Sequence, residues 1–209
     1  MGRDIGPKFK KERRAGVKLM LRGKSSDSPT SPFTKRSYPP GVHGPKGHPR
    51  KTQYGSQLME KQKAKWIYGL REKQFKKYYN KALKAEGDTG AILVQMLEQR
   101  LDNVVFRLGF AATRNQARQF VNHWHIRVNG GKVDIPSYQV KVGDVIEIRD
   151  KSKKMQVFEE NTAGINIEHI PNWLSVDPRA MNGKVVSLPK VDEDQTVFDV
   201  KAIVEFYSR

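Results

Sequence analysis

The feature that most constrains the fold is a change in apolar spacing between Leu97 and Arg149. In the first part of this stretch the apolar residues recur at helical spacing, which predicts a buried stripe along a helix. The stripe comprises Leu97, Leu101, Val104, Val105 and Leu108. Gly109 follows it where helices commonly stop, and Thr113 is a favourable N-cap for a second helix. The sequence therefore predicts two consecutive short helices.

The second helix is expected to have an apolar side and a basic edge. Its apolar side should consist of Ala117, Phe120, Val121 and Trp124. Arg114 and Arg118 are four residues apart, so they share the outer edge, and both are expected to be exposed. Arg100, Asn103 and Arg107 gather on a flank of the first stripe. Such guanidinium groups suit a folded phosphate backbone, although a solvated basic face is the alternative interpretation.

From Ile126 onward the apolar period becomes two, which indicates half-buried strands. Asn129-Gly130 is a strong hairpin signal, and the alternation restarts at Val133 and Ile135. Further strands are predicted at residues 145–148, 173–176 and 184–188, the last two around a turn at Asn182-Gly183. A short helix is expected at 155–163.

The region before this stretch is predicted to be helical between residues 57 and 86, with C-cap glycines at Gly69 and Gly87. Its core should consist of Leu58, Met59, Trp66, Ile67, Leu70, Phe75, Tyr78, Tyr79 and Leu83. Tyr54 and Tyr68 lie beside glycines, so they are the aromatic residues expected to stack on bases instead.

Two further helices have recognisable starts. Thr89 is expected to cap the helix that leads into the central stretch. Near the C-terminus, Thr196 and Asp199 have capping-box spacing. The following helix has one apolar face, formed by Val197, Val200, Ile203, Val204 and Tyr207. This face must be covered, and the helical region before residue 90 is the expected partner.

These elements predict an α+β protein with three parts. Residues 1–52 are proline-rich, glycine-rich and basic, so they are expected to form an extended RNA-binding arm that orders on binding; a solubility tail is the alternative. Residues 53–90 should form a small helical domain completed by 196–209. Residues 91–195 should form a module of two helices and short antiparallel strands, with a core at 97–154 and a C-terminal strand extension.

The positive charge is concentrated in one part of the chain. The 209 residues carry a formal net charge of +17, and residues 1–84 contain 23 Lys and Arg but only 5 Asp and Glu. The remaining residues are close to neutral. An excess of this size most often indicates a polyanionic partner, either nucleic acid or an anionic membrane surface.

Several functional classes lack their usual motifs. The sequence has no Walker-type or dinucleotide-binding glycine loop, no G-x-S-x-G, no H-E-x-x-H and no cysteine. No apolar run is long enough to span a bilayer, and the first residues lack a signal-peptide core. His43 and His48 have too few companions for a zinc site. We therefore expect no enzymatic activity, small-molecule substrate, cofactor, metal or membrane association.

Several blocks match a known family. The stretch from Leu97 to Arg149 resembles the S-four RNA-binding module, which also occurs in tyrosyl-tRNA synthetases and RNA pseudouridine synthases. The resemblance extends over the whole chain, through R-L-D-N-V-V-F-R-L-G-F at 100–110, Y-P-P-G-V-H-G at 38–44, E-K-Q-K at 60–63, I-Y-G at 67–69, E-K-Q-F at 72–75 and V-E-F-Y-S-R at 204–209. These blocks resemble the bacterial-type small-subunit ribosomal proteins number four.

The resemblance implies a structural protein of the small ribosomal subunit, located in the cytoplasm or in an organelle. Such a protein would bind small-subunit rRNA and nucleate assembly of the 5′ domain. Its implied neighbours are small-subunit protein number five and messenger RNA where it enters the subunit. An RNA-modifying enzyme built on the same module and a free RNA-binding regulator are the alternative functions.

One departure concerns zinc. Many family members carry four N-terminal cysteines that bind zinc, and the matching positions here are Phe9, Glu12, Ser26 and Ser31. The resemblance therefore implies a zinc-free form, whose N-terminal segment depends on packing and RNA contacts.

The expected RNA-binding residues combine the basic segments with the positions that match the family's RNA-facing loop and module. They are Arg3, Lys8, Lys10, Lys11, Arg13, Arg14, Arg22, Arg36, Tyr38, His43, Lys46, Arg50, Lys51, Tyr54, Lys61, Lys65, Arg71, Lys73, Lys76, Arg100, Arg107, Arg114, Arg118, His123, Arg127, Asn129 and Lys132.

Overall fold

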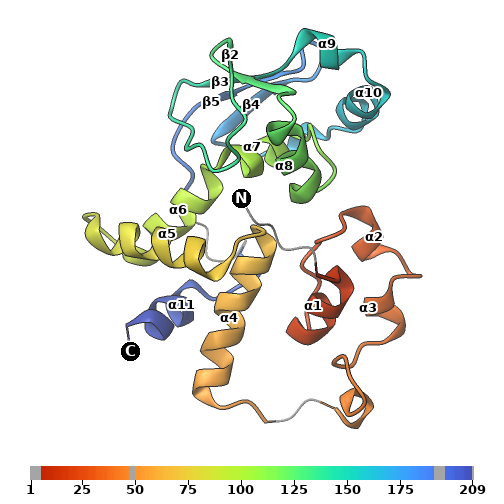
Figure 1. The fold of residues 1–209 in the computed structure, drawn as a ribbon, viewed down its shortest axis with the longest axis vertical. Helices are drawn as coiled ribbons and strands as arrows, with labels where there is room; N and C mark the ends of the chain where they lie inside the picture. The colour runs from red at the N-terminus through yellow and green to blue at the C-terminus, as the bar shows by residue number, and fades with distance from the viewer. Residues whose placement is uncertain (1–5, 48–49, 191–195, 209) are drawn as a thin grey trace. The chain divides into compact units, whose positions relative to one another are not determined.

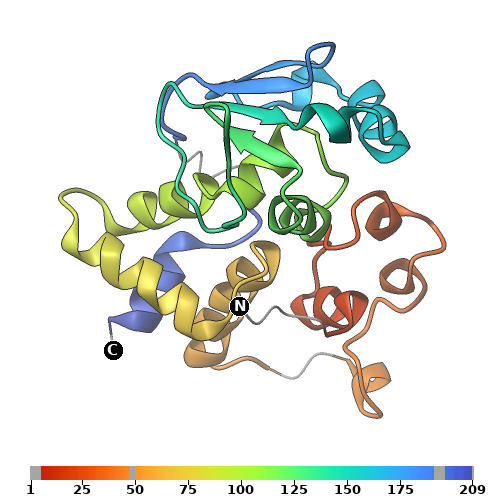
Figure 2. The same ribbon diagram turned by 45° about the horizontal axis from the view of Figure 1, so that its top comes forward.

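The computed structural model describes residues 6–47, 50–190 and 196–208, and the chain divides into two compact units. Unit 1 comprises Met1–Leu93 and Asp192–Arg209, and unit 2 comprises Val94–Val191. Figures 1 and 2 show helices in the first unit and a sheet with helices in the second. The predicted α+β class is confirmed, while the three predicted domain limits stay a prediction.

Unit 1 is built from helices. In chain order they are α1 (Lys8–Ala15), α2 (Lys24–Asp27), α3 (Pro32–Lys35), the 3-10 helix η1 (Gly44–Lys46), α4 (Gln53–Ile67), α5 (Glu72–Lys84), the first part of α6 (Thr89–Glu98) and α11 (Val200–Tyr207). The described part of the arm is therefore not simply extended. Leu19 and Leu21 are buried beside α1, so this segment has a small core of its own.

Helix α11 docks on α4 and α5, as the apolar pattern near the C-terminus predicted (Figure 1). The ring of Tyr207 stacks on that of Tyr79, with centroids 4.6 Å apart, and its hydroxyl donates to Glu72 at 2.7 Å. Gln57 of α4 donates to Glu205 of α11 at 2.7 Å. Aromatic packing and these two side-chain hydrogen bonds together fix the end of the chain on unit 1.

The helix starts in unit 1 differ in detail from the sequence prediction. Asp88, rather than Thr89, caps α6, because its carboxylate accepts from the backbone N–H of Ala91 at 2.7 Å. Asp199 caps α11 by accepting from Ala202 at 3.1 Å, whereas the Thr196 hydroxyl donates to the carbonyl of Phe198. Aspartate is a strong N-cap, so it takes the capping position in both helices.

Unit 2 contains a five-stranded antiparallel sheet in the order β2-β1-β3-β5-β4. Its strands are β1 (Ile126–Val128), β2 (Gly131–Lys132), β3 (Val145–Ile148), β4 (Leu174–Asp177) and β5 (Asn182–Val185). Its helices are the end of α6, α7 (Leu101–Arg107), α8 (Arg114–Asn122), α9 (Asp150–Lys153), α10 (Gln156–Ala163) and the 3-10 helix η2 (Ile167–His169). The helices predicted on both sides of Gly109 and at 155–163 are thus present.

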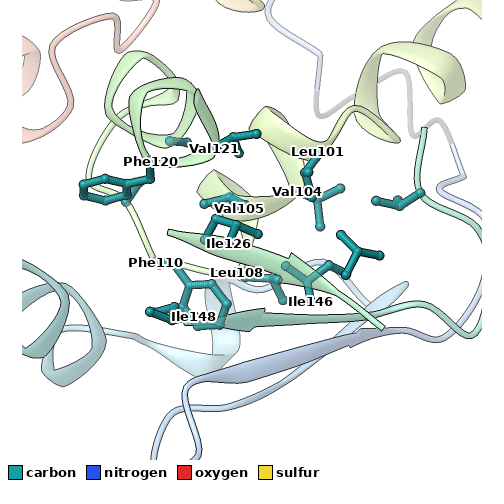
Figure 3. Close-up of a cluster of buried hydrophobic side chains, with 14 of the residues drawn as sticks. Leu101, Val104, Val105, Leu108, Phe110, Phe120, Val121, Ile126, Ile146 and Ile148 are labelled. Carbon is teal, nitrogen blue, oxygen red and sulfur yellow. The ribbon is translucent and has the colours of Figure 1, made fainter. Parts of the chain in front are cut away.

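The core of unit 2 lies between the helices and the sheet. Leu101, Val104, Val105 and Leu108 have no exposed surface, which confirms the predicted stripe. Figure 3 shows these side chains facing those of the strands. Phe120 of α8 also packs on Phe158 of α10, with ring centroids 4.4 Å apart.

The turn between β1 and β2 has the predicted sequence chemistry. Asn129 and Gly130 have φ of 50° and 77°, as a two-residue type I′ hairpin requires. However, β2 ends at Lys132, and Ile135 is 52% exposed, so the alternation at Val133 and Ile135 does not continue the strand.

Asn182-Gly183 does not form the predicted turn. Both residues lie inside β5, and the preceding connection contains Met181 at φ 53°. A Cβ at Gly183 would lie 2.5 Å from Cδ2 of Leu108, which is closer than real Cβ contacts. The glycine is required by the close approach of α7 to the sheet rather than by a turn.

Three apolar side chains are placed differently from the prediction. Trp124 is 54% exposed and Leu83 is 60% exposed, although both were expected in the core. Tyr68 is 6% exposed and its ring contacts that of Phe198, so it is a core residue rather than a base-stacking one.

Candidate nucleic-acid interface

The N-terminal basic segment is organised around Arg13. Its Nε donates to the carbonyls of Arg36 and Tyr38 at 3.0 and 3.1 Å, and its guanidinium lies 4.9 Å from the centre of the Tyr38 ring. Arg13 therefore holds the 36–39 loop against α1. This contact positions Tyr38 at the start of the predicted RNA-binding loop.

A second set of hydrogen bonds involves three of the four positions that match the zinc-binding cysteines of other family members. Glu12 is fully buried, and its Oε1 accepts from the backbone N–H of Leu21 and from the Ser26 hydroxyl, both at 3.0 Å. Ser31 caps α3 by accepting from Thr34 at 3.2 Å. Glu12 and Ser26 thus connect α1 to α2, while Ser31 stabilises the start of α3.

Most of the expected RNA-binding residues in unit 1 lie on its surface. The exposed ones are Lys10, Arg14, Arg22, Arg36, His43, Lys46, Arg50, Lys51, Tyr54, Arg71, Lys73 and Lys76. Lys8, Lys11, Arg13, Tyr38 and Lys65 are half-buried. Burial lowers the pKa of Lys11, and the nearby Lys65 ammonium lowers it further. Arg3 lies outside the described residues.

Lys61 is a correction to the predicted set. It is only 5% exposed, its ammonium lies 2.9 Å from Glu72, and it sits 4.4 Å from the centre of the Phe206 ring. Burial tends to raise the pKa of Glu72, but hydrogen bonds from Lys61, Tyr207 and Lys65 together lower it. Lys61 therefore joins α4 to α5 and α11 and leaves little surface for RNA.

In unit 2, Arg100 and Arg118 are buried around Asp102. Nε and an Nη of Arg100 donate to Asp102 at 3.0 and 2.6 Å, and an Nη of Arg118 lies 3.7 Å from the same carboxylate. Arg100 is 2% exposed, Arg118 7% and Asp102 4%. The expectation that Arg118 is exposed is wrong, and Arg100 is an internal ion partner rather than a surface contact. Asp102 is thus a structural ion partner of both arginines.

Arg114 and Arg107 remain at the surface and are held by a shared network. Arg107 makes a two-pronged contact with Glu98, at 3.0 and 2.9 Å. Asn103 donates to Glu98 at 2.8 Å and accepts from Nε of Arg114 at 2.8 Å. The Arg114 guanidinium also lies 4.5 Å from the centre of the Phe106 ring. These contacts fix one edge of a half-buried guanidinium in advance of any ligand.

The end of α8 and the β1–β2 hairpin contribute the remaining predicted residues. His123, Asn129 and Lys132 are exposed, while Arg127 is half-buried and pairs with Asp150 at 3.0 Å. The Asn129 amide donates to Asp144 and accepts from the N–H of Val145, both at 2.9 Å. Asn129 therefore also ties the hairpin to β3.

Two features of this region were not predicted from the sequence. Asn103 was placed near the arginines, but its role as the hydrogen-bond link to Arg114 depends on the side-chain geometry. Trp124 was placed in the core because it is apolar. The signal that could have corrected this is the strand period starting at Ile126, which leaves no room for the helix to extend past His123.

Among residues 6–47, 50–190 and 196–208, no group of three or more His, Asp or Glu side chains is placed to hold a metal ion. His48 lies outside the described residues. No helix in the described part of the chain is long and apolar enough to cross a bilayer.

The comparisons with known proteins cover the whole chain. The family model for the ribosomal protein S4/S9 N-terminal domain matches residues 3–98, and the model for the S4 domain matches residues 99–146. The small ribosomal subunit protein uS4 of Sulfurihydrogenibium sp. (strain YO3AOP1) is 50% identical over 210 residues, and that of Aquifex aeolicus (strain VF5) is 51% identical over 214. A uS4 protein of Thermus thermophilus is 44% identical over 209 residues. Each alignment covers 100% of both chains.

Two matched regions in this order define the class as ribosomal proteins with an S4 domain. More particularly, the chain belongs to the uS4 family of small ribosomal subunit proteins.

Proposed function

We propose that this chain is a structural constituent of the small ribosomal subunit that binds its rRNA without catalysing a reaction. The end-to-end similarity to uS4 proteins carries this proposal, because it includes both the helical region and the S4 domain. The same similarity does not favour the RNA-modifying alternative. The bacterial relatives imply that the protein acts in the cytoplasm as part of the ribosome.

We infer that exposed basic residues supply most of the affinity. The exposed lysines and arginines of unit 1 can neutralise phosphates, which is the main source of affinity and of salt dependence in nucleic-acid binding. In unit 2, Arg114 presents a fixed guanidinium suited to a folded backbone. Selectivity would then come from the shape of the RNA.

Filter binding to a small-subunit rRNA transcript tests the proposal, with a scrambled RNA of equal length and a salt series. A variant with Arg71, Lys73 and Lys76 changed to glutamine should bind more weakly. Its log-log salt slope should be shallower by about 2 to 3 if each contacts one phosphate. The matched control changes three exposed unit 2 lysines to glutamine, which removes the same charge: Lys141, Lys184 and Lys190.

Two results would contradict the proposal. One is equal affinity of the parent for both RNAs at every salt concentration, and the other is base modification of the transcript by the purified chain. Equal loss in the two triple variants would show that only net charge matters and would refute the placement of the surface on α5.

The finer parts of the proposal rest on the resemblance. We infer that the chain nucleates assembly of the 5′ domain, contacts small-subunit protein number five and lies near messenger RNA where it enters the subunit. Order-of-addition reconstitution tests the first role, since omission of the chain should prevent later proteins from binding. Chemical crosslinking within assembled subunits tests the two neighbours, and crosslinks only to other components would overturn those placements.

A further inference from the structure

Helix α8 ends in an unusual way. The backbone N–H of Trp124 donates to the carbonyl of Val121, and that of His125 donates to the carbonyl of Phe120, both at 3.0 Å. This pair of bonds is the Schellman motif, in which the residue after the C-cap adopts the left-handed conformation. That residue here is Trp124, with φ of 58°.

Two other helices end in the same motif with the expected residue. After α4, Gly69 and Leu70 donate to Trp66 and Lys65, and after α7, Gly109 and Phe110 donate to Phe106 and Val105. The left-handed residues are glycines in both cases, with φ of 61° and 81°. Glycine adopts this conformation without the steric conflict that a Cβ causes. A tryptophan at this position is therefore strained relative to the glycine used elsewhere in the same chain.

Burial does not compensate for this strain. Trp124 is 54% exposed, while Phe120 and Val121, on the preceding turn, are buried. Neither backbone preference nor core packing thus accounts for a large aromatic ring at this position. A role for the ring outside the fold would account for it.

Trp124 lies between two histidines in the chain, and their rings belong to an aromatic cluster at this end of α8. The His125 ring is anchored by contacts to Phe120 and Phe158 and by a 2.9 Å hydrogen bond between its Nδ1 and the Ser152 hydroxyl. The exposed His123 ring lies nearly parallel to that of His125, with centroids 6.3 Å apart. Burial lowers the pKa of His125, and the charges of His123 and Arg149 lower it further.

One carboxylate in this region, that of Asp150, is shared between two cationic side chains. Asp150, next to Arg149 in the chain, lies within 3.0 Å of Arg127 and 3.6 Å of Lys153. This end of α8 therefore combines aromatic rings with Arg149, whose backbone N–H donates to the carbonyl of His125 at 2.8 Å. This combination suits a nucleotide, whose base stacks on an aromatic face while its phosphate meets a cation.

We propose that Trp124 is a stacking platform for an unpaired base of the RNA that the S4 domain binds. The proposal rests on the RNA-binding function proposed above and adds a specific contact to it. A base that has left a helix exposes its π-face, and sequence-specific proteins commonly recognise RNA at such positions. Contact of the ring with a protein or with a second copy of the chain is a different outcome, which the experiments below distinguish.

The decisive comparison uses Trp124→Gly and Trp124→Phe in the full chain. Glycine relieves the backbone strain and removes the ring, so its urea midpoint should equal or exceed that of the parent. Its affinity for a small-subunit rRNA transcript should nevertheless fall about 5- to 100-fold, the range expected for one lost stacked base. Phenylalanine keeps an aromatic face and should retain most of the affinity, with a urea midpoint close to that of the parent.

Fluorescence gives a second readout. In a chain with Trp66 and Trp173 changed to phenylalanine, Trp124 is the only remaining tryptophan. Its emission should be quenched by the transcript and unchanged by dilution of the chain alone. Quenching that is absent, or a change that follows protein concentration without RNA, would overturn the proposal in favour of a solvent-exposed or protein-binding ring.

The experiments distinguish failure of the stacking proposal from failure of the proposed function. If the parent prefers the rRNA transcript over the scrambled RNA but Trp124→Gly binds equally well, only the stacking proposal is refuted. If the parent shows no preference at all, the proposed function itself fails. A Trp124→Gly chain that unfolds more easily than the parent would refute the claim that the tryptophan is strained.

Discussion

The buried ion cluster of unit 2 gives the sharpest prediction. Asp102→Ala removes the carboxylate that accepts two bonds from the guanidinium of Arg100, which is 2% exposed. It also removes a carboxylate that lies 3.7 Å from Arg118. Breaking a buried ion pair by deleting one partner typically costs about 3–5 kcal/mol, because the remaining charge stays desolvated. Native domains are stable by only about 5–15 kcal/mol, so this change should remove a large share of the stability of unit 2.

The other members of the cluster should matter less. Arg118 lies 3.7 Å from the carboxylate, beyond hydrogen-bond distance, whereas Arg100 donates two bonds to it. Arg118→Ala should therefore destabilise by less than Asp102→Ala, with Arg100 still paired. Lys132→Ala, on the exposed β2 strand, is the control and should change the free energy of unfolding by no more than about 0.5 kcal/mol.

Urea denaturation can isolate unit 2 within the whole chain. Trp173 is buried in the core of this unit, so a background with Trp66 and Trp124 changed to phenylalanine makes its fluorescence report that unit alone. The Asp102→Ala midpoint should fall by about 1 M or more, given ordinary urea dependences for small domains.

Two outcomes would refute this reasoning. An unchanged midpoint for Asp102→Ala would show that the carboxylate does not neutralise buried arginines. Alternatively, Arg118→Ala could keep full stability but bind rRNA more weakly. Arg118 would then lie on the surface, as the four-residue spacing from Arg114 suggested.

Three further changes test other parts of the structure. Leu101→Ala should lower the free energy of unfolding of unit 2 by about 2–5 kcal/mol in the same assay, because the side chain is fully buried; a cost under about 1 kcal/mol would contradict this. Glu12→Ala removes the acceptor of the Leu21 N–H and should cost about 1–3 kcal/mol, seen as faster hydrogen exchange of that amide, whereas an unchanged rate would show that Glu12 does not hold the segment. The pKa of Glu72 is below its ordinary value of 4.5, so its contribution to stability is present above pH 4.5 and is lost as the pH falls through the lower pKa of the folded state. Glu72→Gln should flatten this acid dependence in thermal melts followed by circular dichroism. A pH profile identical to that of the parent would contradict this prediction.

The arrangement of the helices and strands was largely predictable because apolar spacing reports it directly. The stripe at Leu101 to Leu108, the Thr113 cap and the Asn129-Gly130 turn each depend on contacts within a few residues in the chain. The Asn182-Gly183 prediction failed because glycine serves two purposes. The local sequence Asn-Gly predicts a turn. The glycine is instead needed because Leu108, which is far away in the sequence, packs closely against Gly183.

The binding surface was harder to predict, because a basic residue on the flank of an apolar stripe can point either into the core or toward solvent. The sequence placed Arg114 and Arg118 on one outer edge and Arg100 on the flank of the preceding apolar stripe. Burial separates them, because Asp102 draws two of the guanidinium groups inward while Asn103 and Phe106 hold the third near the surface. This outcome depends on which carboxylate each arginine can reach, and helical spacing does not contain that information.

Because carboxylates are distributed unevenly along the chain, the two units should contribute to RNA binding in different ways. The first 84 residues contain only five Asp and Glu, and four of them accept hydrogen bonds within unit 1: Glu12, Asp27, Glu60 and Glu72. Most of its exposed lysines thus contribute to an outward positive field. The rest of the chain is near neutral, so unit 2 should contribute through the geometry of single groups such as Arg114 and Trp124. It follows that changes in unit 1 should mainly alter the salt slope of RNA binding, whereas Trp124→Gly should lower the affinity by the same factor at every salt concentration.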